Sequence, residues 1–168
     1  EDIEKCKKVI IDLGFNPVIG KSLYENYGGY MAGKAEIRIE DLHEAFSRKD
    51  IKGIFCVKGG YSASQLLDKI DYELIKNNPK VFVGYSDVTN LHIVFNQKCN
   101  LGTYHGPMVK SNMINDFNDY TKISFFESME KNVTKYEEPE NMPLSILTEG
   151  NTPSENISGV LTGTVFSL

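Results

Sequence analysis

The sequence has no tryptophan, only three cysteines, no long apolar run and no excess of basic residues. No apolar stretch approaches the roughly 18 residues of a membrane-spanning helix, so we expect no membrane partner. Eighteen Lys and Arg against 23 Asp and Glu give a net charge of −5, and no basic residue follows Lys135. This balance argues against the basic face of a nucleic-acid-binding protein.

Cys6, Cys56 and Cys99 are far apart in the sequence and odd in number. Their spacing indicates neither a disulfide framework nor a zinc site. Because Cys6 and Cys56 lie within apolar patterns, we expect both to be buried, reduced thiols, which suits a cytoplasmic protein.

Short apolar runs alternate with helical patterns along the first 135 residues. The runs at 15–19, 54–57, 81–83 and 101–104 predict strands, and the segments between most of them carry apolar residues at helical spacing. The run at 54–57 is continuous and rich in β-branched and aromatic residues, which favours a strand buried on both faces. The alternation predicts an α/β fold, a parallel sheet with helices on both faces.

The composition changes after residue 135. Residues 136–158 contain three of the six prolines and no basic residue, which predicts a linker or a long excursion between domains. The chain begins inside a helix pattern, and residues 159–168 end inside a strand pattern. We therefore expect part of a longer protein: an N-terminal domain over 1–135, a linker over 136–158 and the start of a second domain over 159–168.

The sharpest local feature is Ser86, where a buried apolar strand turns directly into a helix. The run Gly84-Tyr85-Ser86-Asp87 has the setting of a nucleophile elbow, in which a tight turn lifts a serine hydroxyl clear of the sheet. The Asp87 amide then lies in the first helical turn, aimed where an oxyanion would form. The alternative is that Ser86 only caps the helix over 87–97.

Gly59 and Gly60 follow the preceding strand in the same way, within Lys58-Gly59-Gly60-Tyr61. Both loops leave a parallel sheet at its carboxyl edge, where ligands bind. Their amides could complete an oxyanion hole, although an ordinary turn between strand and helix fits the glycines equally well. We predict that the Ser86 hydroxyl is exposed and that its backbone is strained.

A serine nucleophile needs a base, which is usually a histidine. His43 falls in a helix pattern near the surface, and His92 shares a helix face with apolar residues, which favours a buried core side chain. His105 follows a strand and could face the site, or could be a turn residue held by Gly106-Pro107. No histidine makes a convincing base.

These motifs together resemble the LD-carboxypeptidase family, which also contains the microcin C immunity peptidases. The resemblance rests on residues in the family's order and spacing: 32–33, 38, 41–42, 45–46, 58–61, 66–67, 71, 78–80, 84–89, 105–108 and 159–168. Thr164 and Val165 stand where the family usually has Gly-Asn, and Lys58 replaces a common Arg.

The resemblance implies a serine peptidase with a Ser-Glu-His triad and a flavodoxin-like or glutamine-amidotransferase-like N-terminal domain. Ser86 matches the nucleophile, the backbone of Asp87, Gly59 and Gly60 the oxyanion donors, and Tyr61, Tyr85 and His105 are candidates for substrate binding. The triad Glu and His belong to a C-terminal domain and are absent from this chain, as is the first strand of the N-terminal domain. We therefore expect this fragment to be inactive alone.

The substrate implied is a murein tetrapeptide, whose L,D amide bond to a terminal D-alanine is hydrolysed in cell-wall recycling. No metal or cofactor is implied, and a homodimer is left open. Two alternatives remain: a microcin-immunity-type peptidase acting on aminoacyl-nucleotide antibiotics, and a non-catalytic ligand-binding α/β domain.

Overall fold

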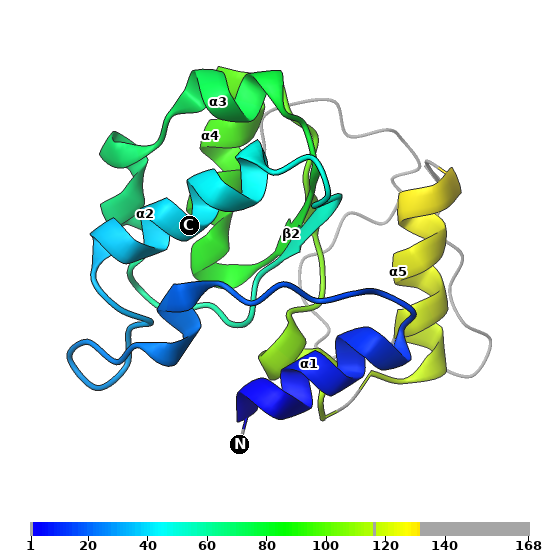
Figure 1. Ribbon diagram of the computed structural model, residues 1–168. Helices are drawn as coiled ribbons and strands as arrows, with labels where there is room; N and C mark the ends of the chain where they lie inside the picture. The colour runs from blue at the N-terminus through cyan, green and yellow to red at the C-terminus, as the bar shows by residue number, and fades with distance from the viewer. Residues whose placement is uncertain (1, 116, 132–168) are drawn as a thin grey trace, which may run out of the picture. The chain divides into compact units, whose positions relative to one another are not determined.

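The computed structural model describes residues 2–115 and 117–131, which form a three-stranded parallel sheet with helices on both faces (Figure 1). The strands β1 (Gly53–Phe55), β2 (Val81–Gly84) and β3 (Tyr104–His105) lie in the order β1-β2-β3. Ile54 pairs with Phe82, and Gly84 pairs with His105. The predicted α/β fold is confirmed, whereas the proposed linker and second domain lie outside the described residues.

Alternating residues of β2 face two separate hydrophobic clusters. Phe82 packs on one face of the sheet with the helices α2 (Ala35–Ser47), α3 (Tyr72–Asn77) and α4 (Thr89–Cys99). Val83 faces the other side, with α1 (Asp2–Asp12), the π-helical turn η4 (Val109–Met113) and α5 (Asp119–Lys131). In Figure 1, α2 and α4 lie on one side of β2 and α5 lies on the other.

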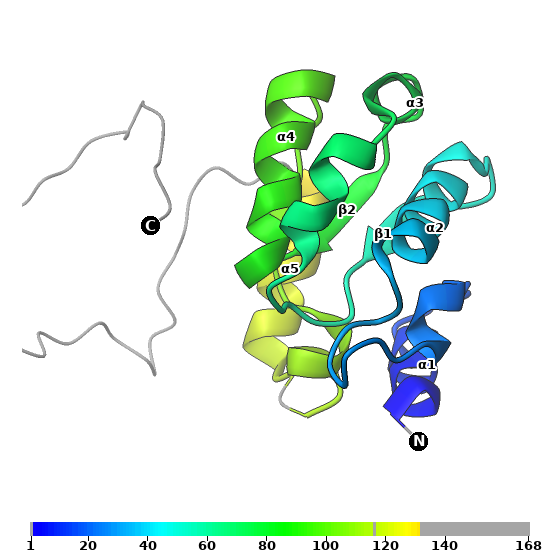
Figure 2. The same cartoon turned by 90° about the vertical axis from the view of Figure 1, so that its left-hand side faces the viewer.

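The first face is the larger cluster, and its centre is aromatic. Phe46 of α2, Phe82 of β2 and Phe95 of α4 are almost fully buried, and the last two rings meet edge to face with centroids 5.0 Å apart. Figure 2 shows α2, α3 and α4 on this side of the sheet. This packing fixes the start of α4, and therefore the turn between β2 and α4.

Three short 3₁₀ helices connect these elements. They are η1 (Lys21–Tyr24), η2 (Ala63–Lys69) and η3 (Ser86–Val88). The helical segment that follows the glycine loop is therefore 3₁₀ rather than α.

The predicted strand over 15–19 is wrong. In the described structure these residues have no regular secondary structure. Phe15 and Val18 are 44% and 50% exposed, so this run does not provide the buried surface that a central strand needs. The predicted strand at 101–104 is shorter than expected and shifted, since β3 comprises only Tyr104–His105.

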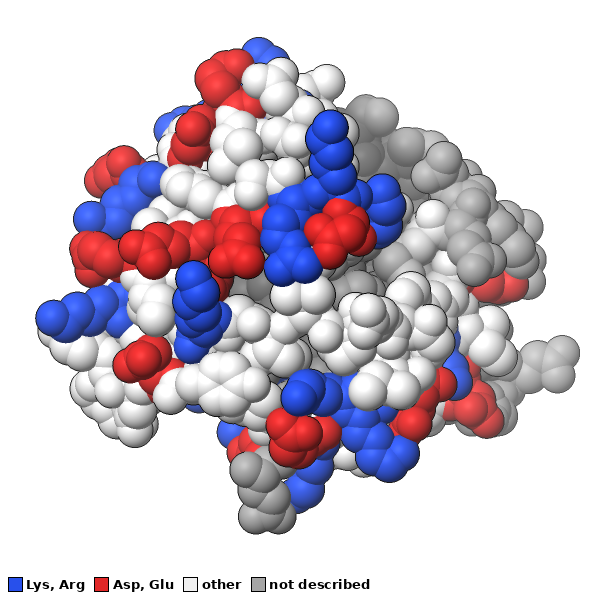
Figure 3. Space-filling model, in the orientation of Figure 1, with Lys and Arg blue, Asp and Glu red and all other residues white. Residues whose placement is uncertain are grey.

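Charged side chains of both signs share the surface. Figure 3 shows Lys and Arg beside Asp and Glu across the visible face. Several form exposed ion pairs, including Lys69 with Glu36 at 3.2 Å and Lys8 with Asp12 at 2.6 Å. Over the described residues, no helix is long and apolar enough to cross a membrane.

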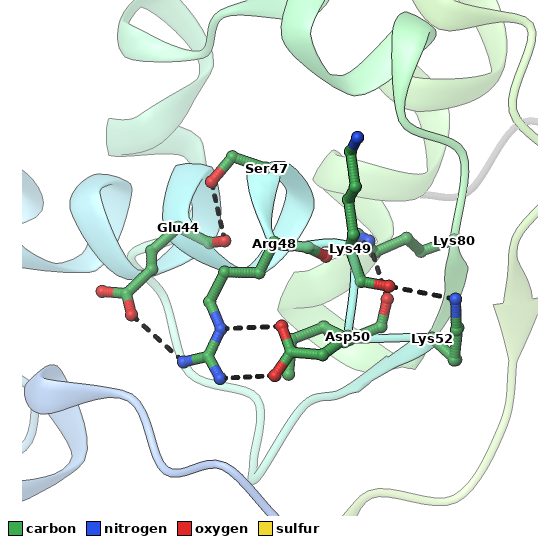
Figure 4. A network of polar contacts seen from close by, with 8 residues as sticks. Glu44, Ser47, Arg48, Lys49, Asp50, Lys52 and Lys80 are labelled. Carbon is green, nitrogen blue, oxygen red and sulfur yellow. Dashed lines mark hydrogen bonds and ion pairs between the residues drawn. The ribbon is translucent and has the colours of Figure 1, made fainter.

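A polar network joins the end of α2 to the beginning of the sheet (Figure 4). Arg48 forms two hydrogen bonds to the Asp50 carboxylate, at 3.1 and 2.7 Å. Lys80, directly before β2, donates to the carbonyl oxygens of Arg48 and Ile51 at 2.8 and 2.7 Å. Because these residues precede β1 and β2, the network lies at the amino edge of the sheet, opposite the turns that follow the strands.

Candidate active site

Ser86 lies at the corner between β2 and the helix that follows it. Its φ angle is 61°, and among the described residues only Asn100 is another non-glycine with a positive φ. This left-handed conformation costs a residue with a side chain about 1–2 kcal/mol. The Ser86 side chain is exposed. Both predictions for the turn, an accessible serine and a strained backbone, are confirmed.

The structure does not support Ser86 as a simple helix cap. Neither η3 nor α4 has a side-chain hydrogen bond at its N-cap, and the N-cap positions belong to Tyr85 and Val88. The left-handed backbone of Ser86 therefore directs its hydroxyl outward without closing the helix end.

Gly84 makes the sharp turn sterically possible. A β-carbon at Gly84 would lie 2.8 Å from Val88 Cγ1 and 3.2 Å from the Cys56 sulfur. Cys56 was predicted to be buried, but the residue is half-buried in the structure. Its sulfur atom nevertheless packs against Gly84. Burial raises the pKa of the Cys56 thiol to about 12, so this cysteine stays a neutral packing group.

The glycine loop after β1 approaches Ser86 closely. A β-carbon at Gly59 would lie 3.0 Å from Ser86 Cβ, 3.2 Å from its Oγ and 3.6 Å from the Asp87 nitrogen. Since β1 and β2 are parallel neighbours, both turns open at the same edge of the sheet, as predicted. The first amides of a helix have no carbonyl partner within it, which leaves the Asp87 amide suited to an anionic oxygen.

The Asp87 side chain ties this edge together. Its Oδ2 accepts hydrogen bonds from the backbone amides of Ser62 and Ala63, both at 2.8 Å. Asn90 donates to the Asp87 carbonyl at 2.9 Å and approaches its Oδ1 at 3.3 Å. These hydrogen bonds hold the end of the glycine loop in place, and they favour a structural role for the Asp87 carboxylate over a role in proton transfer.

Arg38 of α2 extends this network, although its sequence position indicated only a resemblance to the family and no role. Its Nη1 donates to the Ser62 carbonyl at 3.1 Å and to the Ser62 hydroxyl at 2.9 Å, and its Nη2 donates to Gln65 Oε1 at 2.8 Å. Burial lowers the pKa of the Arg38 guanidinium, and the Asp87 carboxylate opposes that shift. One feature of the sequence could have indicated this role for Arg38. It is a charged residue four positions before the apolar Leu42, and residues four apart lie on the same face of a helix.

His92 is a core residue, as predicted. It is 8% exposed, its Nε2 lies 2.9 Å from the Gly84 carbonyl oxygen and its Nδ1 lies 2.8 Å from Thr103 Oγ1. A carbonyl oxygen only accepts, so Nε2 carries the proton and Nδ1 accepts from the Thr103 hydroxyl. Both nitrogens are used, which leaves neither free to act as a base on Ser86.

The other two histidines occupy different settings. His43 is half-buried and its Nε2 accepts a hydrogen bond from the amide of Asp71, the N-cap residue of α3, at 2.9 Å. His105 ends β3, is exposed, and its ring lies 5.8 Å from the Tyr85 ring and 6.2 Å from that of His92. His105 is therefore the histidine that shares the carboxyl edge of the sheet with the Ser86 turn.

The candidate substrate-binding tyrosines differ in exposure. Tyr61 is 88% exposed beside the glycine loop, whereas Tyr85 is half-buried and packs near His105. Over the described residues, no three His, Cys, Asp or Glu side chains gather in a group that could hold a metal ion.

Residues 1–106 match the family described as the LD-carboxypeptidase N-terminal domain, a stretch that contains the Ser86 turn and the glycine loop. The chain belongs to the LD-carboxypeptidase family. It is 36% identical over 151 residues to a probable murein peptide carboxypeptidase of Bacillus subtilis, and the match covers 89% of this chain and 47% of that protein. The chain thus spans less than half the length of the curated relatives it matches.

Two solved structures place this fold within the same family. A structure of MccF in complex with glutamyl sulfamoyl guanosine superposes with a TM-score of 0.75 at 27% identity, and the match covers 83% of this chain and 43% of that chain. A muramoyltetrapeptide carboxypeptidase from Oxalobacter formigenes superposes with a TM-score of 0.65 at 27% identity, covering 77% and 43%. The MccF complex and the muramoyltetrapeptide carboxypeptidase therefore share the fold of this chain.

Proposed function

We propose that this chain is the nucleophile-bearing part of a serine peptidase that hydrolyses the L,D amide bond to a terminal D-alanine in murein tetrapeptides. One observation carries the proposal: Ser86 is exposed at a left-handed corner after β2, and Gly59 lies directly against it. Nucleophilic serines of hydrolases occupy such a corner, with backbone amides beside them. The name of the Bacillus subtilis relative supports a murein peptide as substrate.

In this mechanism Ser86 Oγ attacks the carbonyl carbon of the scissile amide. The bond to the carbonyl oxygen becomes single, and the Asp87 amide with that of Gly59 or Gly60 binds the resulting anion. The C–N bond then breaks, D-alanine leaves as the amine, and water hydrolyses the acyl ester on Ser86. A base must take the hydroxyl proton and return it to the leaving amine. The family resemblance assigns this base to a His supported by a Glu, both outside this chain.

The decisive experiment compares Ser86→Ala with the wild type in the full-length protein that carries this chain. D-alanine release from a murein tetrapeptide should fall by roughly 10⁴-fold or more, as in other serine triads. Ser47→Ala, at an exposed serine of α2, is the matched control and should retain full turnover. A Ser86→Ala protein that keeps a tenth of the wild-type turnover contradicts the assignment of the nucleophile.

A second candidate substrate is an aminoacyl-nucleotide conjugate, which the MccF structure with glutamyl sulfamoyl guanosine favours. The same Ser86 chemistry would release the amino acid from such a conjugate. Side-by-side values of kcat/KM for a murein tetrapeptide and for an aminoacyl sulfamoyl nucleoside distinguish the two. We expect the murein peptide to be preferred. If the protein hydrolyses neither compound but still binds one of them, the chain belongs to a non-catalytic binding domain.

We further propose a cytoplasmic location, which the cysteine chemistry supports. Cys6, Cys56 and Cys99 are all free thiols, and Cys6 and Cys99 are buried. Such reduced cysteines are typical of a reducing compartment. Thiol titration of the protein purified from cells without added reductant should detect all three cysteines after unfolding.

A further inference from the structure

Arg38 is connected to the candidate oxyanion site through a single residue, Ser62. Arg38 Nη1 binds the Ser62 carbonyl and hydroxyl at 3.1 and 2.9 Å, while the Ser62 amide binds Asp87 Oδ2 at 2.8 Å. Ser62 follows Gly60 by two residues, and Asp87 directly follows Ser86. The three contacts therefore join α2, the glycine loop and the elbow in one chain of charged hydrogen bonds.

These contacts act on the two segments whose amides would bind the oxyanion. One set of donors is in Gly59-Gly60 and the other is the amide of Asp87, which come from loops after different strands. The Asp87 carboxylate accepts hydrogen bonds from the amides of Ser62 and Ala63, and Arg38 donates to the carbonyl and hydroxyl of Ser62. Because bonds from two different elements meet at Ser62, the loop has little freedom to move relative to Ser86.

The Arg38 side chain is poorly arranged for stability alone. Its Nε is buried and makes no hydrogen bond with the described residues. A buried donor without a partner costs about 1–3 kcal/mol, so this arrangement of the guanidinium carries an energetic cost. Nη1 and Nη2 together make three hydrogen bonds, two to Ser62 and one to Gln65, which points to a role in fixing geometry.

We propose that Arg38 is a positioning residue for the oxyanion-binding amides, acting through Ser62 and Asp87. This inference rests on the proposed function of Ser86. Oxyanion donors must lie within about 2.7–3.1 Å of the developing charge, and a misplacement of about 1 Å can lower the rate about 100-fold. Loss of Arg38 should therefore slow the chemical step and leave ground-state binding nearly unchanged.

The test uses Arg38→Met, Arg38→Lys and Arg48→Met in the full-length protein, with a murein tetrapeptide as substrate. Arg48 is the matched control, since it directly follows the last residue of α2 and, among the described residues, its guanidinium pairs with Glu44 and Asp50. For Arg38→Met we expect kcat to fall roughly 10–100-fold while KM changes less than about 3-fold. Arg38→Lys should recover part of kcat because one donor remains, and Arg48→Met should keep the wild-type kcat.

A second readout separates positioning from a general loss of structure. A peptide boronate that forms a tetrahedral adduct with Ser86 should lose affinity in Arg38→Met by about the factor lost in kcat/KM. The hydrolysed tripeptide product has a planar carboxylate at the reacting carbon and forms no tetrahedral adduct, so it should bind with unchanged affinity. Should Arg38→Met fail to fold by circular dichroism, Arg38→Lys and Ser62→Ala carry the test, because each removes only part of the contact.

The outcomes distinguish this role from the proposed function. A wild-type protein without Ser86-dependent turnover contradicts the function and the positioning role together. Ser86-dependent turnover that folded Arg38 variants retain at the wild-type kcat overturns the positioning role alone. Equal loss of boronate and product affinity in Arg38→Met also overturns it, since that pattern indicates general damage to the binding site.

Discussion

A methyl group on Gly59 would lie 3.2 Å from the hydroxyl oxygen of Ser86 and 3.0 Å from its β-carbon. Such separations are shorter than ordinary van der Waals contacts, so a side chain at position 59 would push Ser86 aside by a few tenths of an ångström. The absence of a β-carbon is therefore what allows the backbone of one loop to approach the nucleophile of another.

Gly59→Ala should lower catalysis more than stability. Gly59 does not have a positive φ in this structure, so alanine is accepted by the backbone but presses on Ser86. We expect kcat to fall by roughly 10–100-fold in the full-length protein, from displacement of the serine or the amide. Gly102→Ala is the control, because nothing lies within 4 Å of its β-carbon position and its φ is not positive. Equal kcat in the two variants would show that the contact at Gly59 is harmless.

The strain at Ser86 predicts an unusual order of stability. Ser86→Gly should be more stable than Ser86→Ala by about 1 kcal/mol, because only glycine adopts a φ near 61° without penalty. At Ser124, in the middle of α5, glycine should instead be less stable than alanine by about 0.5–1 kcal/mol. Urea unfolding of the four variants measures both differences. The same order at both positions would mean that the Ser86 backbone relaxes in solution.

The elbow could be predicted from sequence because its determinants are local. A buried strand at 81–83, a glycine and a serine before a helix are consecutive residues, and their order indicates the turn. The approach of Gly59 followed from one further rule, that neighbouring parallel strands present their carboxyl ends at one edge. Helix spacing placed His92 correctly in the core.

The parts that were missed depend on contacts distant in sequence. Arg38 meets Ser62 across 24 residues, and Ser62 meets Asp87 across another 25. No periodicity within α2 shows which loop lies beside it. The segment 15–19 failed for a related reason: its short run with apolar residues resembled a strand, but its position leaves Phe15 and Val18 half exposed.

Lys80 should contribute to stability and not to catalysis. Its ammonium group donates to two carbonyl oxygens, of Arg48 and Ile51, at the amino edge of the sheet, and burial lowers its pKa. Lys80→Met removes both bonds and should lower the free energy of unfolding by about 1–3 kcal/mol. Lys52→Met, which removes one exposed bond to the Lys49 carbonyl, should have a smaller effect. Because the network is remote from Ser86, kcat should be unchanged, and a loss of kcat in Lys80→Met would contradict this separation.

His92 should make stability depend on pH in a defined direction. Burial lowers its pKa from 6.5, His105 lowers it further, and the hydrogen bond to the Gly84 carbonyl partly opposes both effects. Below pH 6.5 the imidazole is therefore protonated in the unfolded chain but still neutral in the folded protein. The free energy of unfolding decreases as the pH is lowered, until His92 is also protonated in the folded state. The slope attributable to this one group is at most about 1.4 kcal/mol per pH unit, and it vanishes above pH 6.5, where both states are neutral.

His92→Gln, which keeps a donor for Gly84, should flatten the pH dependence of the unfolding free energy between pH 5 and 7 (roughly the range of histidine titration). The exposed His105 supplies the control, since His105→Gln should retain most of the slope. A wild-type slope in His92→Gln would assign the titration to another group and remove the support for a neutral His92 beneath the elbow.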